Sequence, residues 1–300
     1  MNTPPFAFVK ENHPLGPHTL YRIGGPAKWA FLPRDAHEAQ TAYTWIIDQK
    51  VPFLVMGAGS NMLIDDRGFD GAVLFTTELK HREACGGDRF RLGAGLPLAD
   101  MVRTIMLPNN YAGTGALTGI PGSLGGALFM NAGTVNGTIC QFTETVILLT
   151  PSGFTTIAMA PELYGYRGQA FCGPDAVIVE AVLRFTPSEK DESVVYHHYI
   201  QRRLDTQPQG WCCGSVFKNP PNDHAGRLIE SCGLKGTRRG GAVISEKHAN
   251  FIMNEDNASF EDVLGLIQLV KDTVFAQHGV KLQEEVRIIT PRSGPGVPPA

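Results

Sequence analysis

Charged residues are scarce in this chain of 300 residues, and their scarcity limits the classes to which it can belong. Asp, Glu, Lys and Arg make up 18% of the chain, below the roughly 25% of typical soluble proteins, whereas hydrophobic residues make up 43%. A disordered chain needs the opposite balance, so that class is excluded. The net charge of −3 argues against broad nucleic-acid binding. No run approaches the roughly 20 apolar residues of a membrane span.

Cysteine is also scarce, and the six cysteines form no Cys-x-x-Cys pair. Disulfide frameworks are typical of shorter, cysteine-rich secreted chains, so we expect reduced thiols and a cytoplasmic location. The N-terminus lacks the basic and apolar regions of a signal peptide. The nine histidines show no zinc-type spacing, which predicts no metal site. The adjacent Cys212 and Cys213 are interpreted as small buried residues, with a redox role left open.

No repeat of fixed period is present, which excludes solenoids and propellers and leaves a mixture of helices and strands. Apolar spacing and capping signals predict helices that begin after Asp35 and Ser259, and a shorter helix at 225–232. Short apolar runs predict strands, at 53–56, 145–149, 154–157, 176–185 and 286–289. A charged cluster near 187–193 is typical of a linker or a domain boundary. The sequence therefore predicts an α+β chain with at least two domains.

Glycine is abundant, at 34 of 300 residues, and two glycine-containing loops are of particular interest. One loop, 57–61, directly follows a predicted strand, and the other runs from Gly119 to Gly133. Because glycine leaves the backbone uncovered, its N–H groups can approach a phosphate. A tight turn packed on a neighbouring element is the simpler explanation for either loop alone, but two such loops favour a pyrophosphate cofactor. Neither loop matches the Rossmann or P-loop pattern.

Five motifs occur in an order that resembles one family, the UDP-N-acetylenolpyruvoylglucosamine reductases (MurB). They are Tyr21–Ala27, Gly57–Asn61, Gly119–Gly133, Gly214–Pro220 and Ser245–Phe251, and the resemblance extends from about residue 12 to residue 290. The resemblance implies an FAD-binding domain of the vanillyl-alcohol-oxidase type and a separate, smaller α+β substrate domain. It implies FAD as cofactor and NADPH as co-substrate. The implied reaction reduces the enolpyruvyl group of UDP-N-acetylenolpyruvoylglucosamine and yields UDP-N-acetylmuramate for peptidoglycan.

The resemblance also divides the chain and assigns the glycine loops to FAD. It implies an N-terminal segment at 1–20, an FAD-binding domain at 21–188 with parts at about 21–80 and 81–188, a substrate domain at 189–290, and a disordered tail at 291–300. The residues expected to bind FAD are Gly57, Ala58, Gly59, Ser60, Asn61, Gly119, Ile120, Pro121, Gly122, Ser123, Gly125, Gly126, Asn131, Ala132 and Gly133. No obligate protein partner, nucleic acid or membrane insertion is implied.

Three residues take catalytic roles by the same resemblance. Arg167 and Glu285 would stabilise an enolate-like intermediate, and Ser215 would donate the proton. By residue type alone, Arg167 reads as a surface cation and Ser215 as a turn hydroxyl. Glu284 and Glu285 are adjacent and would point to opposite sides of a strand. The position before the valine in the family's motif selects Glu285.

The substrate-binding residues implied are Tyr166, Arg203, Lys218 and Asn219, with Arg202 an alternative to Arg203 as a partner for phosphate. The short segment between Arg167 and Ser215 resembles the branch of the family that lacks an extra tyrosine-bearing loop.

Two positions depart from the family's pattern, since Gln169 replaces a small hydroxyl residue and Val135 replaces a tyrosine. These departures put the loop geometry in doubt but not the class. Two alternatives remain beside the reductase: an FAD-dependent alcohol or sugar oxidase of the same fold, and a non-catalytic nucleotide-sugar binding protein.

Overall fold

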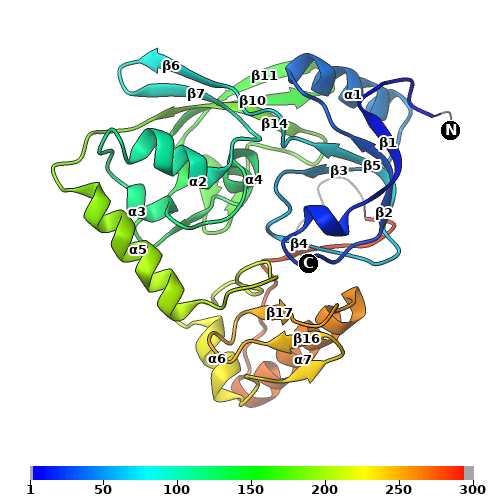
Figure 1. Ribbon diagram of the computed structural model, residues 1–300, viewed down its shortest axis with the longest axis vertical. Helices are drawn as coiled ribbons and strands as arrows, with labels where there is room; N and C mark the ends of the chain where they lie inside the picture. The colour runs from blue at the N-terminus through cyan, green and yellow to red at the C-terminus, as the bar shows by residue number, and fades with distance from the viewer. Residues whose placement is uncertain (1–2, 294–300) are drawn as a thin grey trace.

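The computed structural model describes residues 3–293 and arranges them as three units of strands and helices (Figure 1). The first unit is a four-stranded sheet of order β1-β2-β5-β3, in which β1 is antiparallel to β2 and the other pairs are parallel. Its strands are β1 (Val9–Pro14), β2 (Pro26–Phe31), β3 (Phe53–Met56) and β5 (Phe69–Phe75). The 3-10 helix η1 (Gly16–His18) lies in the connection between β1 and β2.

Helix α1 (Ala36–Asp48) packs against the first sheet through its apolar face. Ala39, Tyr43 and Ile46 are buried there in one cluster with residues of β2 and β3. The Asp35 carboxylate accepts a hydrogen bond from the Glu38 amide at 2.8 Å, so the predicted start of this helix is confirmed.

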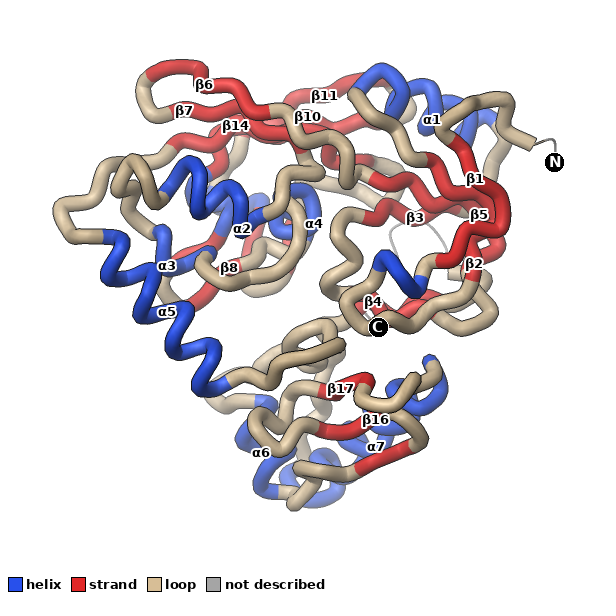
Figure 2. The backbone as a smooth tube through the Cα atoms, viewed as in Figure 1, coloured by secondary structure: helices blue, strands red, loops and turns tan. Residues whose placement is uncertain are grey.

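The second unit is a five-stranded antiparallel sheet of order β11-β10-β14-β7-β6. Short helices pack against it around one large apolar core (Figure 2). The strands are β6 (Arg82–Gly86), β7 (Arg89–Gly93), β10 (Thr143–Thr150), β11 (Gly153–Ala158) and β14 (Val177–Arg184). The helices are α2 (Leu98–Met101), the π-helix η2 (Val102–Met106), α3 (Thr114–Leu117), α4 (Leu124–Phe129), η3 (Ile139–Phe142) and η4 (Pro161–Leu163). The strands predicted at 145–149, 154–157 and 176–185 are confirmed within β10, β11 and β14.

Two small hairpins extend from the second unit, and both lie close to the later site. They are β8 (Gly133–Thr134) with β9 (Gly137–Thr138), and β12 (Tyr164–Gly165) with β13 (Gly168–Gln169).

The third unit packs helices α6 (Ala225–Ser231) and α7 (Phe260–His278) against a three-stranded sheet. Its strands, in the order β15-β16-β17, are β15 (Arg238–Arg239), β16 (Ala242–Ile244) and β17 (Ile252–Asn254). Ser259 and Asp262 form a reciprocal capping box at the start of α7, which confirms the helix predicted to begin there, and Gly279 ends the helix with a left-handed φ of 67°.

The charged segment predicted as a linker is instead fastened to the second unit. Asp191 caps helix α5 (Glu192–Thr206), Glu192 is buried, and its amide donates to the Asn110 side chain at 2.9 Å. Asn110 also donates to the carbonyl oxygen of Lys190. The cluster is therefore a capped helix start, and α5 runs from the second unit towards the third (Figure 1).

The last strand, β18 (Arg287–Ile289), returns to the first unit and pairs in parallel with β4 (Met62–Ile64). Of the predicted tail, residues 294–300 lie outside the described residues. Residues 291–293 depart from the disorder expected of them, because the Ser293 amide donates to the Thr290 carbonyl oxygen at 3.0 Å and Asp70 donates to Pro291 at 3.1 Å. Helix α5 and this return strand together bring segments of all three units to one place.

Candidate active site

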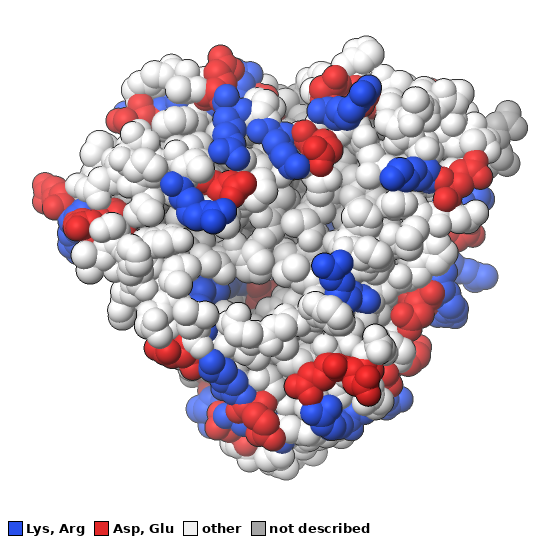
Figure 3. Space-filling model, in the orientation of Figure 1, with Lys and Arg blue, Asp and Glu red and all other residues white. Residues whose placement is uncertain are grey.

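A cavity of about 1110 Å³ lies where the three units meet. Figure 3 shows a hollow in this face whose rim is mostly uncharged. All fifteen residues predicted to bind the cofactor line the cavity. The predicted catalytic residues Arg167, Ser215 and Glu285 line it too, so the structure brings together residues from all three units.

The loop 57–61 follows β3 and presents its backbone to the cavity. None of its five amides donates a hydrogen bond to another residue within 3–293. Gly59 has φ 60°, and a Cβ added there would overlap the carbonyl oxygen of His18. A Cβ on Gly57 would overlap Ser123 Oγ in the second loop. Gly57 therefore permits the close approach of the two loops, and Gly59 permits the close approach of the first loop to η1.

The second loop supplies an unpaired hydroxyl to the same cradle. Ser123 Oγ is buried and has no hydrogen-bond partner among the residues described. Gly122 has φ 128°, and a Cβ there would lie 2.8 Å from Ser60 Oγ. Buried hydroxyls are rarely left unsatisfied in proteins. The free amides and this hydroxyl therefore suit a polar, anionic ligand such as a pyrophosphate.

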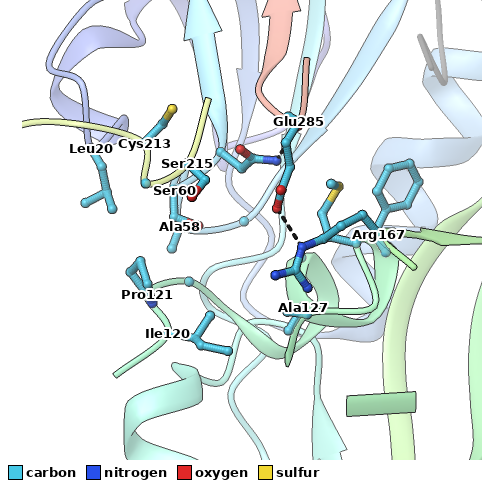
Figure 4. A pocket seen from close by; sticks show the side chains of 18 of the residues that line it. Leu20, Ala58, Ser60, Ile120, Pro121, Ala127, Arg167, Cys213, Ser215 and Glu285 are labelled. Atoms are coloured by element: carbon cyan, nitrogen blue, oxygen red, sulfur yellow. Dashed lines mark hydrogen bonds and ion pairs between the residues drawn. The ribbon is translucent and has the colours of Figure 1, made fainter. Parts of the chain in front are cut away.

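The side chains of Arg167 and Glu285 point towards each other and meet inside the cavity (Figure 4). Arg167 Nε lies 2.9 Å from Glu285 Oε1, and the two side chains are only 23% and 17% exposed. The Nε–H is not directed along this line and makes no hydrogen bond, while the guanidinium donates to the Gly133 carbonyl oxygen at 3.1 Å. Burial raises the pKa of Glu285, and the positive charges of Arg167 and Lys218 oppose that shift.

Glu285 enters the cavity because its backbone is held from two sides. Asn61 Nδ2 donates to its carbonyl oxygen at 2.9 Å, and its amide donates to Val216 at 2.7 Å. Glu284 is buried elsewhere and pairs with Lys271 of α7 at 2.7 Å. Glu285 therefore lines the cavity, whereas Glu284 does not.

Ser215 lies on a loop that a buried asparagine holds in place. Asn250 Oδ1 accepts from the Phe217 amide at 2.9 Å, and Asn250 Nδ2 donates to the Phe217 carbonyl oxygen at 2.8 Å. The Val216 amide donates to the carbonyl oxygen of Asn250 at 2.9 Å. Figure 4 shows Ser215 and Glu285 projecting from neighbouring segments. The backbone that follows Ser215 is thereby held beside the segment of Glu285, whose amide donates to Val216.

The predicted substrate-binding residues are spread around the cavity mouth. The Tyr166 ring is exposed, and its hydroxyl accepts from the Asn219 amide at 3.3 Å. Arg203 donates from Nε to the Thr118 carbonyl oxygen at 2.9 Å, and burial lowers its pKa. Arg202 also lines the cavity but is more exposed. Lys218 is not among the lining residues, although its charge acts on Glu285.

The two residues that depart from the family's pattern, Gln169 and Val135, lie differently with respect to the cavity. The Gln169 side chain binds the segment that follows its hairpin, donating to the Cys172 carbonyl oxygen at 2.9 Å and accepting from the Cys172 amide at 2.6 Å. Val135 lines the cavity and is 96% exposed. The bulk of Gln169 is therefore absorbed outside the cavity, whereas Val135 leaves the rim more open than a tyrosine would.

Three residues at the site had no role in the sequence analysis. Tyr199 of α5 lines the cavity and is hydrogen-bonded to Asn136, Asn250 holds the Ser215 loop, and Arg287 lines the cavity two residues after Glu285. Asn250 lies within a recognised motif, and Arg287 adjoins another. Tyr199 had no such signal, because it reaches the site only through the docking of α5 on α3, where Gly115 admits its ring.

Comparisons with protein families match both parts of the chain. Residues 27–156 match an FAD binding domain, and residues 206–289 match the C-terminal domain of UDP-N-acetylenolpyruvoylglucosamine reductase. These matches support the expected α+β architecture of an FAD-binding domain followed by a second domain. None of the helices within 3–293 combines the length and apolar character needed to cross a membrane.

Curated relatives match almost the whole chain. The UDP-N-acetylenolpyruvoylglucosamine reductase of Chlamydia felis is 38% identical over 95% of this chain and 95% of its own. That of Thermotoga maritima is 39% identical over 91% and 96%. The crystal structure of the reductase (MurB) from Thermus caldophilus superposes with a TM-score of 0.79 at 31% identity, covering 94% of this chain and 98% of that one.

Proposed function

Because the chain belongs to the UDP-N-acetylenolpyruvoylglucosamine reductase family, we propose that its central cavity carries out this reduction through Arg167, Ser215 and Glu285. The protein is an FAD-dependent oxidoreductase. The assignment of roles rests on one observation: these three side chains line the same cavity as the two glycine loops. They lie far apart in sequence, and only the fold gathers them.

FAD fits the cradle formed by the two loops. The free amides of 57–61 and the unpaired hydroxyl of Ser123 are the groups that would hold its pyrophosphate. The Cβ overlaps expected with Ser123 at Gly57 and with His18 at Gly59 explain why these two positions lack side chains, and their absence leaves the backbone of the loop uncovered. When bound, FAD supplies hydride transfer from NADPH to the enolpyruvyl double bond.

Arg167 and Glu285 are suited to the charge that develops during this reduction. Addition of hydride to the terminal carbon of the enolpyruvyl group moves negative charge towards its carboxylate. The Arg167 guanidinium is held by Gly133 and approached only on one side by Glu285, so its remaining N–H groups are available to that charge. Glu285 holds the guanidinium in the cavity and adds a carboxyl whose pKa is raised by burial.

Ser215 is the group we assign to protonate the neighbouring carbon. A hydroxyl is a weak acid, so it must be placed accurately and its developing negative charge must be stabilised. The hydrogen bonds of Asn250 to Phe217 hold the loop that carries Ser215. The positive charges of Arg167 and Lys218, both of which act on Glu285, favour the negative charge that develops on the serine oxygen.

The remaining substrate residues and the compartment complete the proposal. We assign the UDP diphosphate to Arg203, whose planar guanidinium suits two phosphates, and the sugar to Tyr166 and Asn219 at the mouth. NADPH is the proposed reductant. The proposed compartment is the cytoplasm, where NADPH and UDP-sugars occur and where the six free thiols would stay reduced.

Half-reactions followed by flavin absorbance test the proposal. We expect a yellow protein that NADPH bleaches under anaerobic conditions and that the enolpyruvyl UDP-sugar reoxidises. Ser215→Ala should slow reoxidation by the sugar about 100-fold or more while bleaching by NADPH is retained. Ser231→Ala, in α6 away from the cavity, is the control and should match the wild type.

Three outcomes would contradict the proposal. A protein that takes up no FAD would refute the cofactor site. Fast reoxidation by oxygen with none by the UDP-sugar would favour an oxidase. Binding of the sugar without any reoxidation in the wild type would favour a non-catalytic binding protein.

A further inference from the structure

Arg287 is a cavity arginine without a polar partner for its side chain. Its Nε is buried and unsatisfied, and its guanidinium makes no hydrogen bond or ion pair with another residue in the described part of the chain. The contact present is with the ring of Phe129, whose centroid lies 5.0 Å from the guanidinium carbon. Arg287 is half-buried, and a cation withdrawn from water to this extent without a polar partner is costly, which indicates that an electron-rich ligand completes the site.

The other cavity arginines do not share this condition. Arg203 donates to the Thr118 carbonyl oxygen and to Gln207, and Arg167 has both Glu285 and the Gly133 carbonyl oxygen. Arg202 is exposed to solvent. Burial lowers the pKa of Arg287, in keeping with a charge that the protein alone does not neutralise.

The neighbours of Arg287 belong to the cofactor side of the cavity. Its amide donates to the Asn61 carbonyl oxygen at 3.0 Å, so its backbone is attached to the first glycine loop. Phe129 ends α4, the helix that contains Gly125 and Gly126. The proposed substrate residues Arg203, Tyr166 and Asn219 come instead from α5, the β12–β13 hairpin and the third unit.

Glu285 and Arg287 line the same cavity, while Val286 between them is buried in the core of the third unit. A ring that exchanges hydride with a substrate held at Arg167 and Glu285 must lie close to both. Arg287, two residues further along, is therefore next to that ring and not at the distant diphosphate.

We propose that Arg287 is the cation that faces the redox-active ring of bound FAD and favours its reduced form. Hydride from NADPH brings two electrons and one proton, so the ring gains one negative charge until a second proton is taken up. A fixed cation beside the ring stabilises that added charge and raises the midpoint potential. The inference rests on the proposed placement of FAD in this cavity.

The test measures the midpoint potential of the holoenzyme by dye-equilibrated spectroscopy. Arg287→Met removes the charge with little change in length, and Arg287→Lys retains the charge. We expect Arg287→Met to lower the two-electron potential by about 30 mV or more, which is a tenfold change in the equilibrium constant. Arg287→Lys should restore most of this loss. Arg203→Met, the matched cavity cation, should leave the potential unchanged.

The alternative outcomes each decide against the inference. A potential in Arg287→Met within about 10 mV of the wild type would refute it, as would an equal fall in Arg203→Met, because the effect would then not be specific to this position. A weakened affinity for the UDP-sugar at unchanged potential would assign Arg287 to substrate. Should Arg287→Met fail to retain FAD, Arg287→Gln is measured and judged by the same limits. Failure of the wild type to bind FAD would instead refute the proposed function.

Discussion

Substitution of Gly59 tests whether the first glycine loop is shaped by a steric requirement. In Gly59→Ala, the new Cβ would overlap the His18 carbonyl oxygen and lie 3.0 Å from the carbonyl carbon and 2.8 Å from Met56 Cε. Two of these three atoms belong to the backbone, so a side-chain rotation does not relieve the overlap. The loop must therefore move away from η1.

The cost of this movement has two parts. A non-glycine residue at φ 60° costs about 1–2 kcal/mol. Moving the loop also breaks the hydrogen bond from the Leu20 amide to the Gly59 carbonyl oxygen, at 3.1 Å, which contributes about 0.5–1.5 kcal/mol. We expect a loss of roughly 1.5–3.5 kcal/mol in the free energy of unfolding. A displaced cradle should also weaken FAD binding at least about tenfold.

Gly87→Ala is the matched control, because Gly87 has φ 58° and its nearest atom would be Arg89 Nη1 at 3.6 Å, an ordinary contact. It should lose about 1 kcal/mol and bind FAD normally. Stability is measured by urea unfolding of the apoprotein, and affinity by flavin fluorescence. If Gly59→Ala were no less stable than Gly87→Ala and bound FAD as tightly, the steric reasoning would be wrong.

Three further substitutions have expected outcomes. Burial raises the pKa of Glu285 in the folded state, so the contribution of this carboxyl to stability falls as the pH rises from the unfolded pKa of about 4.3 through the raised pKa. Glu285→Gln should remove this pH-dependent fall in the free energy of unfolding, measured by urea titrations at several pH values. An unchanged pH profile in the variant would contradict this reasoning. Asn250→Ala should slow reoxidation of the flavin by the UDP-sugar about 10- to 100-fold while the affinity for FAD is retained. An equal loss in the reoxidation rate and in FAD affinity would indicate general unfolding. Asp35→Ala should cost about 0.5–2 kcal/mol in thermal or urea unfolding, and no loss would show that the cap is dispensable.

Local signals in the sequence were sufficient for much of the fold. The Asp35 and Ser259 caps fix helix starts through hydrogen bonds within a few residues, and so they could be read directly. The cluster near 187–193 was misread because its partner, Asn110, lies about 80 residues away. A linker and a capped helix start share the same charged composition, and only tertiary contacts separate them.

The residues of the site likewise divide into those that local sequence signals predict and those that depend on tertiary contacts. The glycine loops were predictable because their chemistry is carried by residue type and local spacing. Arg167 and Glu285 needed the family's motif order, since nothing local brings together two residues so far apart in the chain. Arg287 and Tyr199 were missed because their significance depends on what surrounds them: an unsatisfied guanidinium in one case and the docking of α5 in the other.

The pairing of β18 with β4 has a consequence for how the protein is made. Strand β4 directly follows the first glycine loop, yet its partner β18 is synthesised much later, since Arg287 pairs with Met62. At about 5–20 residues per second, the ribosome needs roughly 10–40 s to add the intervening chain. During that interval the loop 57–61 lacks both β18 and the hydrogen bond between Asn61 and Glu285. Completion of the flavin site thus waits for the synthesis of β18, and a nascent chain stalled before residue 285 carries the cradle without its closing strand.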